Sequence, residues 1–217
     1  MNTSNTNPNI NRRHFSAALA LSPLVGLTAA QAQNATAVVG QPAPDFSATD
    51  TAGKVHRLSD FKGKLVVLEW TNPGCPFVRK HYSGNMQGLQ KEFTAKGVVW
   101  LAINSTGTNS GDHMAPAKLG AWVREMQAQP TAMLMDEPGK IGQRYAAKTT
   151  PHMYIINPQG QLIYAGAIDS IPSARVDDIK TATNYVRQSL HEALAGKPIS
   201  MASTRPYGCT VKYSDQA

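Results

Sequence analysis

Two apolar runs without alternation stand out in the first half of the chain, at residues 65–70 and 98–103. Such runs are typical of strands that are covered on both faces, because no position along them has to face water. The first run carries a single charge, Glu69. With a helix predicted between them, the two runs form a parallel strand, helix, strand unit, and the first strand is predicted to be central.

The helix of this unit is predicted to begin at Pro76, directly after Cys75. Proline favours the first position of a helix because its missing N–H would have no partner there. Residues 83–85, Ser-Gly-Asn, weaken the middle of the helix, and Lys96-Gly97 ends it. Cys75 is therefore expected at the amino end of a helix.

Antiparallel hairpins are predicted on either side of this unit. Residues 46–50 and 55–58 are strand-like around a Thr-Ala-Gly-Lys turn, and residues 59–62 could form one helical turn. Residues 153–156 and 161–165 flank Asn-Pro-Gln-Gly, which is a hairpin signal.

Helical spacing returns over residues 116–129, and residues 133–135 are strand-like. A final amphipathic helix is predicted from apolar residues at helical spacing, namely Val176, Ile179, Val186, Leu190 and Ala193. The elements together predict an α/β fold with a mixed central sheet flanked by helices, an N-terminal hairpin extension and a C-terminal tail.

Residues 1–32 have the pattern of an export signal. A polar stretch precedes Arg12-Arg13-His14-Phe15, a mostly apolar run follows, and Ala30-Gln31-Ala32 offers a cleavage site. The adjacent arginines resemble the twin-arginine export motif. The alternative is an uncleaved anchor, but the run falls short of the roughly 20 residues that cross a bilayer. We predict cleavage after Ala32, a periplasmic location and no stable membrane insertion afterwards.

The rest of the chain divides into a linker at 33–40, one domain at 41–197 and a tail at 198–217 that carries Cys209. The net charge is +7, and about +5 without the signal arginines, with basic residues scattered among acids. No basic stripe suits a phosphate backbone, so nucleic acid is not an expected partner. The two cysteines are too few for a four-thiolate zinc site or a disulfide scaffold, and a redox pair is possible.

Cys75 at a helix start and Thr150-Pro151 before the later hairpin make the chain similar to thioredoxin-fold proteins. Pro44-Asp45-Phe46 and Gly63-Lys64 resemble the redoxin branch, which is the alkyl hydroperoxide reductase and thiol-specific antioxidant family. The resemblance covers about residues 40–195.

More narrowly, residues 69–78 and the tail sequence Pro206-Tyr207-Gly208-Cys209 are similar to a peroxiredoxin-like subgroup of this family. Thioredoxins carry a second cysteine where this chain has Val78, so a local dithiol is absent. Asn72 and Leu68 stand where peroxidatic sites have Thr or Ser and Pro.

Cys75 is the candidate nucleophile. The partial positive charge and unpaired N–H groups of a helix amino end stabilise a thiolate, and Arg79 lies one turn along on the same face. Lys80 and His81 add positive charge nearby. These features predict a lowered pKa for Cys75, whereas the alternative is a small buried apolar residue.

The resemblance implies roles for residues around this thiol. Glu69 matches the buried acid of thioredoxins and would relay protons, although it could instead reach water or pair with a lysine. Thr150-Pro151 matches the cis-proline that faces the active cysteine, and together with Pro76 it would contact substrate. The backbone before this proline would then be free to pair with an incoming chain. A trans proline that starts an ordinary strand is the alternative.

Cys209 lies in a turn-rich tail that we expect to be mobile, and it is the candidate resolving thiol for Cys75. A permanent structural bridge and a free thiol are the alternatives. A metal site of Cys75 with His81, His113 and His152 is disfavoured, because Arg79 stands where copper-handling relatives have a second cysteine. We expect neither a metal nor a cofactor.

The function predicted from the sequence is a periplasmic thiol-disulfide oxidoreductase with Cys75 as nucleophile. Its partners would be a disulfide-bearing protein, or a small thiol or peroxide, and an external thiol reductant. One alternative is a thiol-dependent peroxidase, in which Cys75 becomes a sulfenic acid first. Another class is a non-catalytic module that binds metal or protein, in which Cys75 is inert.

Overall fold

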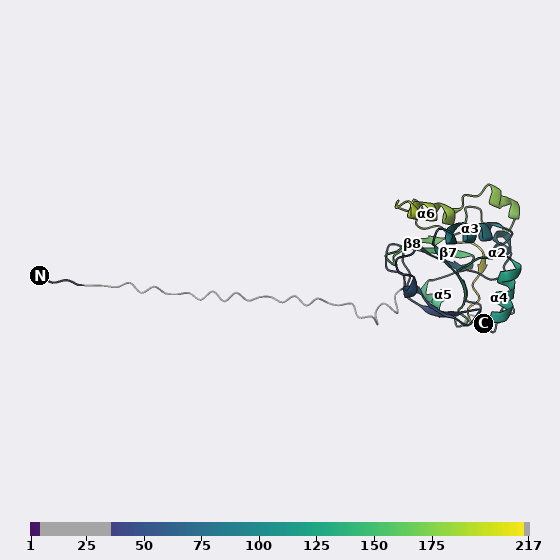
Figure 1. Cartoon of the computed structure of the whole chain (residues 1–217), viewed down its shortest axis with the longest axis horizontal. Coiled ribbons are helices and arrows are strands. Elements are labelled where there is room, and N and C mark those ends of the chain that lie inside the picture. The colour runs from purple at the N-terminus through teal and green to yellow at the C-terminus, as the bar shows by residue number, and fades with distance from the viewer. Residues whose placement is uncertain (5–35, 215–217) are drawn as a thin grey trace.

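Seven strands form one mixed sheet in the computed structural model, which describes residues 1–4 and 36–214 (Figure 1). The arginine pair, the apolar run and the cleavage site of the predicted export signal lie outside these described residues. Within the described ranges, no helix combines the length and the apolar character needed to cross a membrane.

The sheet is centred on the two apolar runs of the sequence. β3 (Val66–Trp70) pairs in parallel with β4 (Val99–Asn104) and antiparallel with β7 (His152–Ile156). Every residue of β3 and β4 is buried, because helices or loops cover both faces. The prediction of an inner strand that leads to Cys75 is therefore confirmed.

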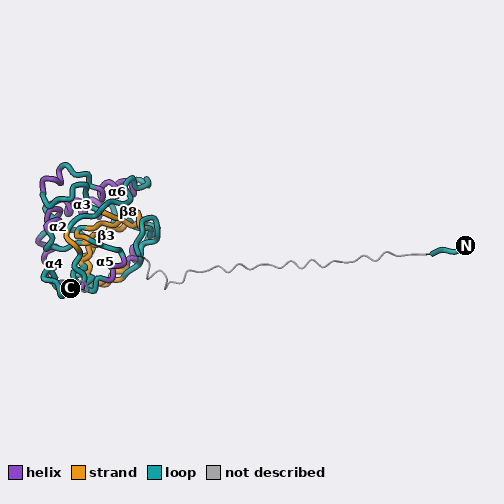
Figure 2. Tube along the Cα trace, turned by 180° about the vertical axis from the view of Figure 1, so that it is seen from behind, coloured by secondary structure: helices purple, strands orange, loops and turns teal. Residues whose placement is uncertain are grey.

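The remaining strands extend the sheet on both sides, in the order β2-β1-β5-β4-β3-β7-β8. β5 (Ala132–Met135) is parallel to β4, and β1 (Ser47–Asp50) joins β5 to β2 (Val55–Arg57) through antiparallel pairs. β8 (Leu162–Gly166) forms the predicted antiparallel hairpin with β7. The strands are orange in Figure 2.

The predicted helix from Pro76 to residue 97 is two helices, α2 (Pro76–His81) and α3 (Asn85–Thr94). The chain breaks at Gly84, whose φ of 126° is open to glycine but strained for other residues. α4 (Pro116–Glu125) and the short α5 (Lys140–Arg144) follow later in the chain. The residues that weakened the predicted helix therefore interrupt it.

The predicted final helix is wrong in its first half. Residues 176–180 form a 3-10 turn, η2 (Val176–Lys180), and the helix proper is α6 (Tyr185–Leu194). The side chain of Asn184 accepts a hydrogen bond from the N–H of Arg187, which caps α6 at a new start. Val176 is half exposed, so its helical spacing does not mark a buried face.

Alternate residues of β3 point to two different cores. Val66, Leu68 and Trp70 face the side of α5 and of the 3-10 turn η1 (Leu58–Phe61). Val67 faces the side of α2, α3 and α6, and Cys75 belongs to this second core. Figure 1 shows α3 and α6 on one side of the sheet and α5 on the other.

The expectation of a mobile tail is wrong for residues 203–214. β9 (Cys209–Thr210) pairs antiparallel with β6 (Thr149–Thr150), so the tail is bound to the domain. Val211 and Tyr213 are buried in the core on the α5 side.

Candidate active site

Cys75 lies where the sequence placed it, directly before the first residue of α2, and only 2% of its surface is exposed. Asn72 shapes the loop that presents it. The Asn72 carbonyl accepts the N–H of Cys75 at 3.0 Å, its side-chain oxygen accepts the N–H of Gly74 at 2.7 Å, and its amide donates to Thr106 Oγ1 at 3.1 Å. The side chain that replaces the peroxidatic Thr or Ser is therefore engaged in holding the loop.

Cys75 and Cys209 form a disulfide that joins residues 134 positions apart, with their Cα atoms 5.9 Å apart. These are the two cysteines of the whole sequence. The free-thiol alternative for Cys209 is thus wrong for this state of the protein. Cys209 reaches Cys75 because β9 runs beside β6, with Cys209 opposite Thr150.

The Thr150-Pro151 peptide bond is cis, as the resemblance implied, so the alternative of a trans proline is wrong. The carbonyl oxygen of Thr150 lies 3.0 Å from Cys75 Sγ. The backbone of Thr150 is not free, however, because the protein's own Cys209 pairs with it. Pro76, the first residue of α2, is exposed.

Glu69 is fully buried and accepts three hydrogen bonds, from Trp100 Nε1 at 2.8 Å, Tyr82 Oη at 2.8 Å and Gln90 Nε2 at 3.2 Å. It therefore neither reaches water nor pairs with a lysine, and both of those alternatives are wrong. Burial raises the pKa of its carboxyl group, although the three donors oppose that rise. Tyr82 directly follows α2, so this network is connected to the helix that begins at Cys75.

Three basic residues of α2, Arg79, Lys80 and His81, were expected to place positive charge around Cys75, but the structure places them in three different environments. Arg79 is exposed, and its Nε donates to the carbonyl of Pro73 at 3.0 Å. Lys80 is buried and pairs with Asp169 at 3.2 Å. Burial lowers the pKa of His81 to about 4, so this ring is neutral at pH 7. Arg79 alone of the three presents its charge to solvent near the loop.

Sequence reasoning missed Tyr207, which links the tail to α2. Its hydroxyl donates to Asp169, lies 3.1 Å from His81 Nε2 and 3.4 Å from Lys80 Nζ. Its ring packs edge-on against Phe77, with centroids 5.8 Å apart. Burial raises the pKa of this phenol above its ordinary value. The one sequence feature that could have indicated this contact was Asp169, a lone acidic residue that follows an apolar strand.

The histidines that were weighed as metal ligands each have a protein partner. His113 Nε2 is 2.8 Å from Glu137, His81 contacts Tyr207, and Nδ1 of His152 lies 3.0 Å from the hydroxyl of Tyr154. In the part of the chain that the structure describes, no three His, Cys, Asp or Glu side chains are grouped to hold a metal.

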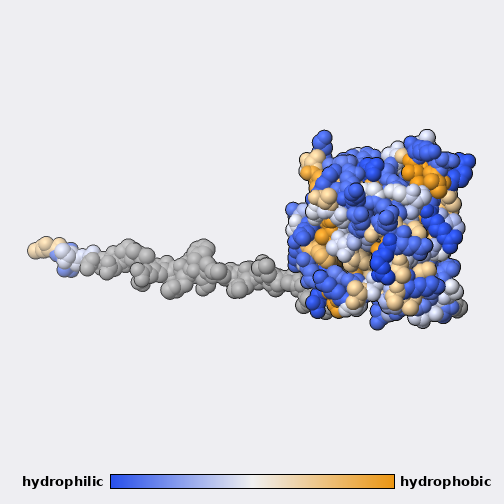
Figure 3. All heavy atoms as spheres, turned by 45° about the vertical axis from the view of Figure 1, so that its right-hand side comes forward, coloured by the Kyte–Doolittle hydropathy of each residue, from blue (hydrophilic) through white to orange (hydrophobic). Residues whose placement is uncertain are grey.

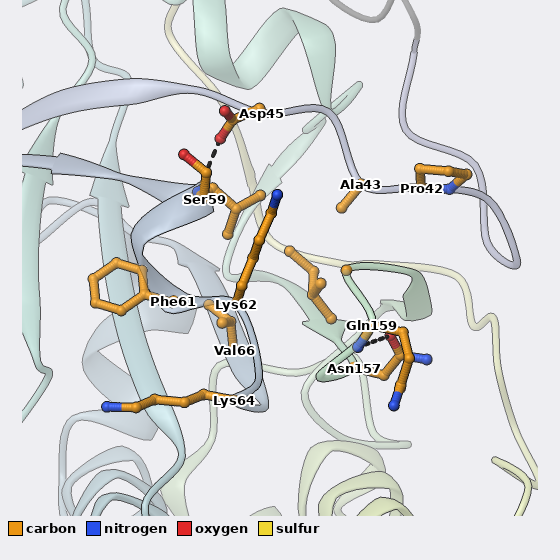
Figure 4. A pocket seen from close by; sticks show the side chains of 13 residues that line it. Pro42, Ala43, Asp45, Ser59, Phe61, Lys62, Lys64, Val66, Asn157 and Gln159 are labelled. Atoms are coloured by element: carbon orange, nitrogen blue, oxygen red, sulfur yellow. Dashed lines mark hydrogen bonds between the residues drawn. The ribbon is translucent and has the colours of Figure 1, made fainter.

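A separate pocket of about 250 Å³ lies between η1 and the β7–β8 turn. Lys64 and Val66 line it at the amino end of β3, whereas Cys75 follows the carboxyl end of that strand. The amino groups of Lys62 and Lys64 point in different directions (Figure 4). This pocket is therefore not part of the cysteine site.

The sequence matches the AhpC/TSA family over residues 39–165. Among curated proteins it is 27% identical over 124 residues to the thiol-disulfide oxidoreductase ResA of Bacillus subtilis (strain 168). That alignment covers 57% of this chain and 64% of the relative, so the chain spans less than two thirds of the relative's length.

Two solved structures match most of the chain. A hypothetical protein from Sinorhizobium meliloti 1021 has a TM-score of 0.73 at 22% identity, covering 82% of this chain and 96% of its own. An uncharacterized conserved protein from Geobacillus kaustophilus has a TM-score of 0.71 at 26% identity, covering 83% and 94%. The predicted thioredoxin-like architecture is confirmed, and with more than half of its length matched, the chain belongs to the AhpC/TSA family.

Proposed function

We propose that this protein is a thiol-disulfide oxidoreductase that uses Cys75 as its nucleophile and Cys209 as its resolving thiol. The observation that carries the proposal is the disulfide between them, built at the start of α2 and beside the cis-proline loop. Cys75 is the better nucleophile because the amino end of a helix stabilises its thiolate, whereas Cys209 lies on a strand. The name of the ResA relative supports the same activity.

In the reduced protein, the Cys75 thiolate attacks one sulfur of a substrate disulfide and expels the other as a thiolate. Cys209 then attacks Cys75 Sγ, which closes the Cys75–Cys209 bond and releases the second substrate sulfur. Two electrons pass from the protein to the substrate. An external thiol returns them, and no bound cofactor is needed.

The roles of the neighbouring residues stay proposals. Arg79 contributes positive charge beside the loop of Cys75. Glu69, whose raised pKa keeps a proton available nearer to neutral pH, takes part in proton movement through its contact with Tyr82. Pro76 is exposed beside Cys75 and offers a surface to the substrate, whereas Thr150 and Pro151 are buried against the tail and hold Cys209 where a substrate chain would otherwise pair.

The test is to mix the reduced protein with oxidised glutathione and, separately, with hydrogen peroxide. With the disulfide, we expect the wild type to lose both thiols and Cys209→Ser to stop at a mixed disulfide on Cys75. We expect Cys75→Ser to react much more slowly than the wild type, because its remaining thiol, Cys209, lies on a strand and has no helix amino end to stabilise its thiolate.

Mass mapping of the quenched samples reports each product. A faster reaction with peroxide than with disulfide would instead identify a peroxidase, which the engaged side chain of Asn72 does not favour. Equal behaviour of the wild type and both variants would identify a binding module with inert cysteines. A bridge that glutathione cannot open in the folded protein would identify a structural disulfide.

We further propose that residues 1–32 export the protein to the periplasm and are removed after Ala32. A redox-active disulfide suits that oxidising compartment. Amino-terminal sequencing of the exported protein should begin at Gln33. Mature protein that still contains Arg12 would contradict the cleavage.

A further inference from the structure

The C-terminal segment is held on both sides of Cys209 by contacts that do not involve sulfur. After Cys209, the N–H of Val211 donates to Lys148 O at 3.1 Å and the hydroxyl of Tyr213 donates to Ala147 O at 2.7 Å. Before it, the side chain of Tyr207 enters the domain. None of these contacts involves a sulfur atom of the disulfide.

Tyr207 enters a socket of three ionisable residues, Lys80, His81 and Asp169, whose side chains are almost completely buried. Burying such groups is costly unless each has partners. The Tyr207 hydroxyl contacts all three, and its ring lies 5.4 Å from Lys80 Nζ. Each of the three also has a partner other than this phenol. Asp169 pairs with Lys80 and accepts the N–H of Ile171, and Lys80 donates to the carbonyl of Ile171. Nδ1 of His81 lies 2.9 Å from the side-chain amide of Asn85. The socket is thus complementary to one tyrosine of the tail.

The socket and the nucleophile share one short helix. Cys75 precedes α2, while Lys80 and His81 lie at its end. The Tyr207 hydroxyl contacts Lys80 and His81, and Cys209 is bonded to Cys75, so both tail residues meet α2. The residue between them, Gly208, lies against the backbone of Thr150, where a side chain has no room.

We propose that Tyr207 is a positioning residue that keeps Cys209 docked beside Cys75 after the disulfide has opened. The proposal rests on the proposed function. The two cysteines then form a preassembled dithiol, although they are far apart in the sequence. When Cys75 carries a mixed disulfide, the Cys209 thiolate attacks Cys75 Sγ without first having to move into place, and the substrate thiolate leaves.

A rate measurement can separate the role of Tyr207 from that of Cys75. Reduced wild type, Tyr207→Phe and Tyr185→Phe react with oxidised glutathione and are quenched with acid over time. We expect Tyr207→Phe to form the mixed disulfide within about twofold of the wild-type rate, because Cys75 itself is unchanged. Resolution by Cys209 should slow about tenfold, which corresponds to about 1.4 kcal/mol.

Tyr185→Phe is the matched control. Tyr185 and Tyr207 both line a surface cleft next to β6. The hydroxyl of Tyr185, unlike that of Tyr207, has no hydrogen bond within the described part of the chain. Both of its rates should equal those of the wild type. Wild-type resolution in Tyr207→Phe, with an intact fold by thermal unfolding, would overturn the proposal.

Amide hydrogen exchange of the reduced protein tests the docking without any reaction. We expect the N–H of Val211 and the amides of β9 to be protected in reduced wild type and to exchange at least tenfold faster in Tyr207→Phe. Free exchange in reduced wild type would overturn the proposal. Protection together with no reaction toward glutathione would support the docking and contradict the proposed function.

Discussion

Gly208→Ala should leave both cysteines as free thiols under mild oxidation that converts the wild type completely. Gly208 has a φ of 138°, and a Cβ at this position would overlap the carbonyl oxygen of Thr150 and lie 2.7 Å from its carbonyl carbon. The obstructing atoms are backbone, so a side chain cannot turn away to make room. Either β9 leaves β6 or the cis-proline loop moves.

Such a movement breaks the geometry of the disulfide. A disulfide needs Cα atoms no more than about 7 Å apart, and those of Cys75 and Cys209 are 5.9 Å apart. A shift of a little over 1 Å in the wrong direction is therefore enough to prevent it. Thiol titration and mass mapping after oxidation measure the outcome.

Gly196→Ala is the control, because Gly196 also has a positive φ, of 67°, but no atom lies within 4 Å of its added Cβ. This variant should oxidise like the wild type and report the cost of backbone strain alone. Complete oxidation of Gly208→Ala at the wild-type rate would show that the close approach of β9 to β6 is not required.

Glu69→Leu should lower the free energy of unfolding by about 3–5 kcal/mol, a large part of the total for a domain of this size. The fully buried carboxylate accepts from Trp100, Tyr82 and Gln90, and leucine offers none of them an acceptor. Each buried donor left without a partner costs about 1–3 kcal/mol, less what relaxation recovers. Urea denaturation measures the change.

Glu69→Gln is the matched variant, since its amide oxygen can accept from Trp100 and Gln90 while its NH₂ donates to Tyr82. This substitution should lower the free energy of unfolding by less than about 1.5 kcal/mol.

Folding raises the pKa of Glu69 above 4.5. The stability that comes from binding this proton is therefore complete below pH 4.5, and it is lost as the pH rises through the pKa of the folded state. The free energy of unfolding of Glu69→Gln should therefore rise relative to that of the wild type as the pH increases from 4.5 to 8. An unchanged difference over that range would contradict the raised pKa.

Local patterns predicted the inner sheet well, because the apolar runs of β3 and β4 and the hairpin signal of β7 and β8 lie within short stretches of sequence. Cys75 at the start of α2 follows equally from Pro76. The break before α6 was missed because apolar periodicity does not show where a helix starts, although Asn184 was a usable cap signal.

Docking of the tail could not be predicted in the same way. β9 has two residues, and its position depends on partners that are distant in the sequence, such as Thr150 and Asp169. Lys80 and His81 were expected to add positive charge near Cys75, and charged residues are rarely buried unless they are paired. Their partners, Asp169 and Tyr207, are recognised only when the chain is folded.

The long closure between Cys75 and Cys209 makes residues 75–209 a covalent macrocycle that contains β4 to β8 and helices α2 to α6. In a chain-entropy view, a ring of this size disfavours the unfolded state by about 5 kcal/mol. A single protease cut inside the ring would release no fragment while the bond is closed. The reduced form, which is the one that donates electrons, lacks this covalent ring. The protein is therefore most susceptible to unfolding and proteolysis in the state that is ready to react.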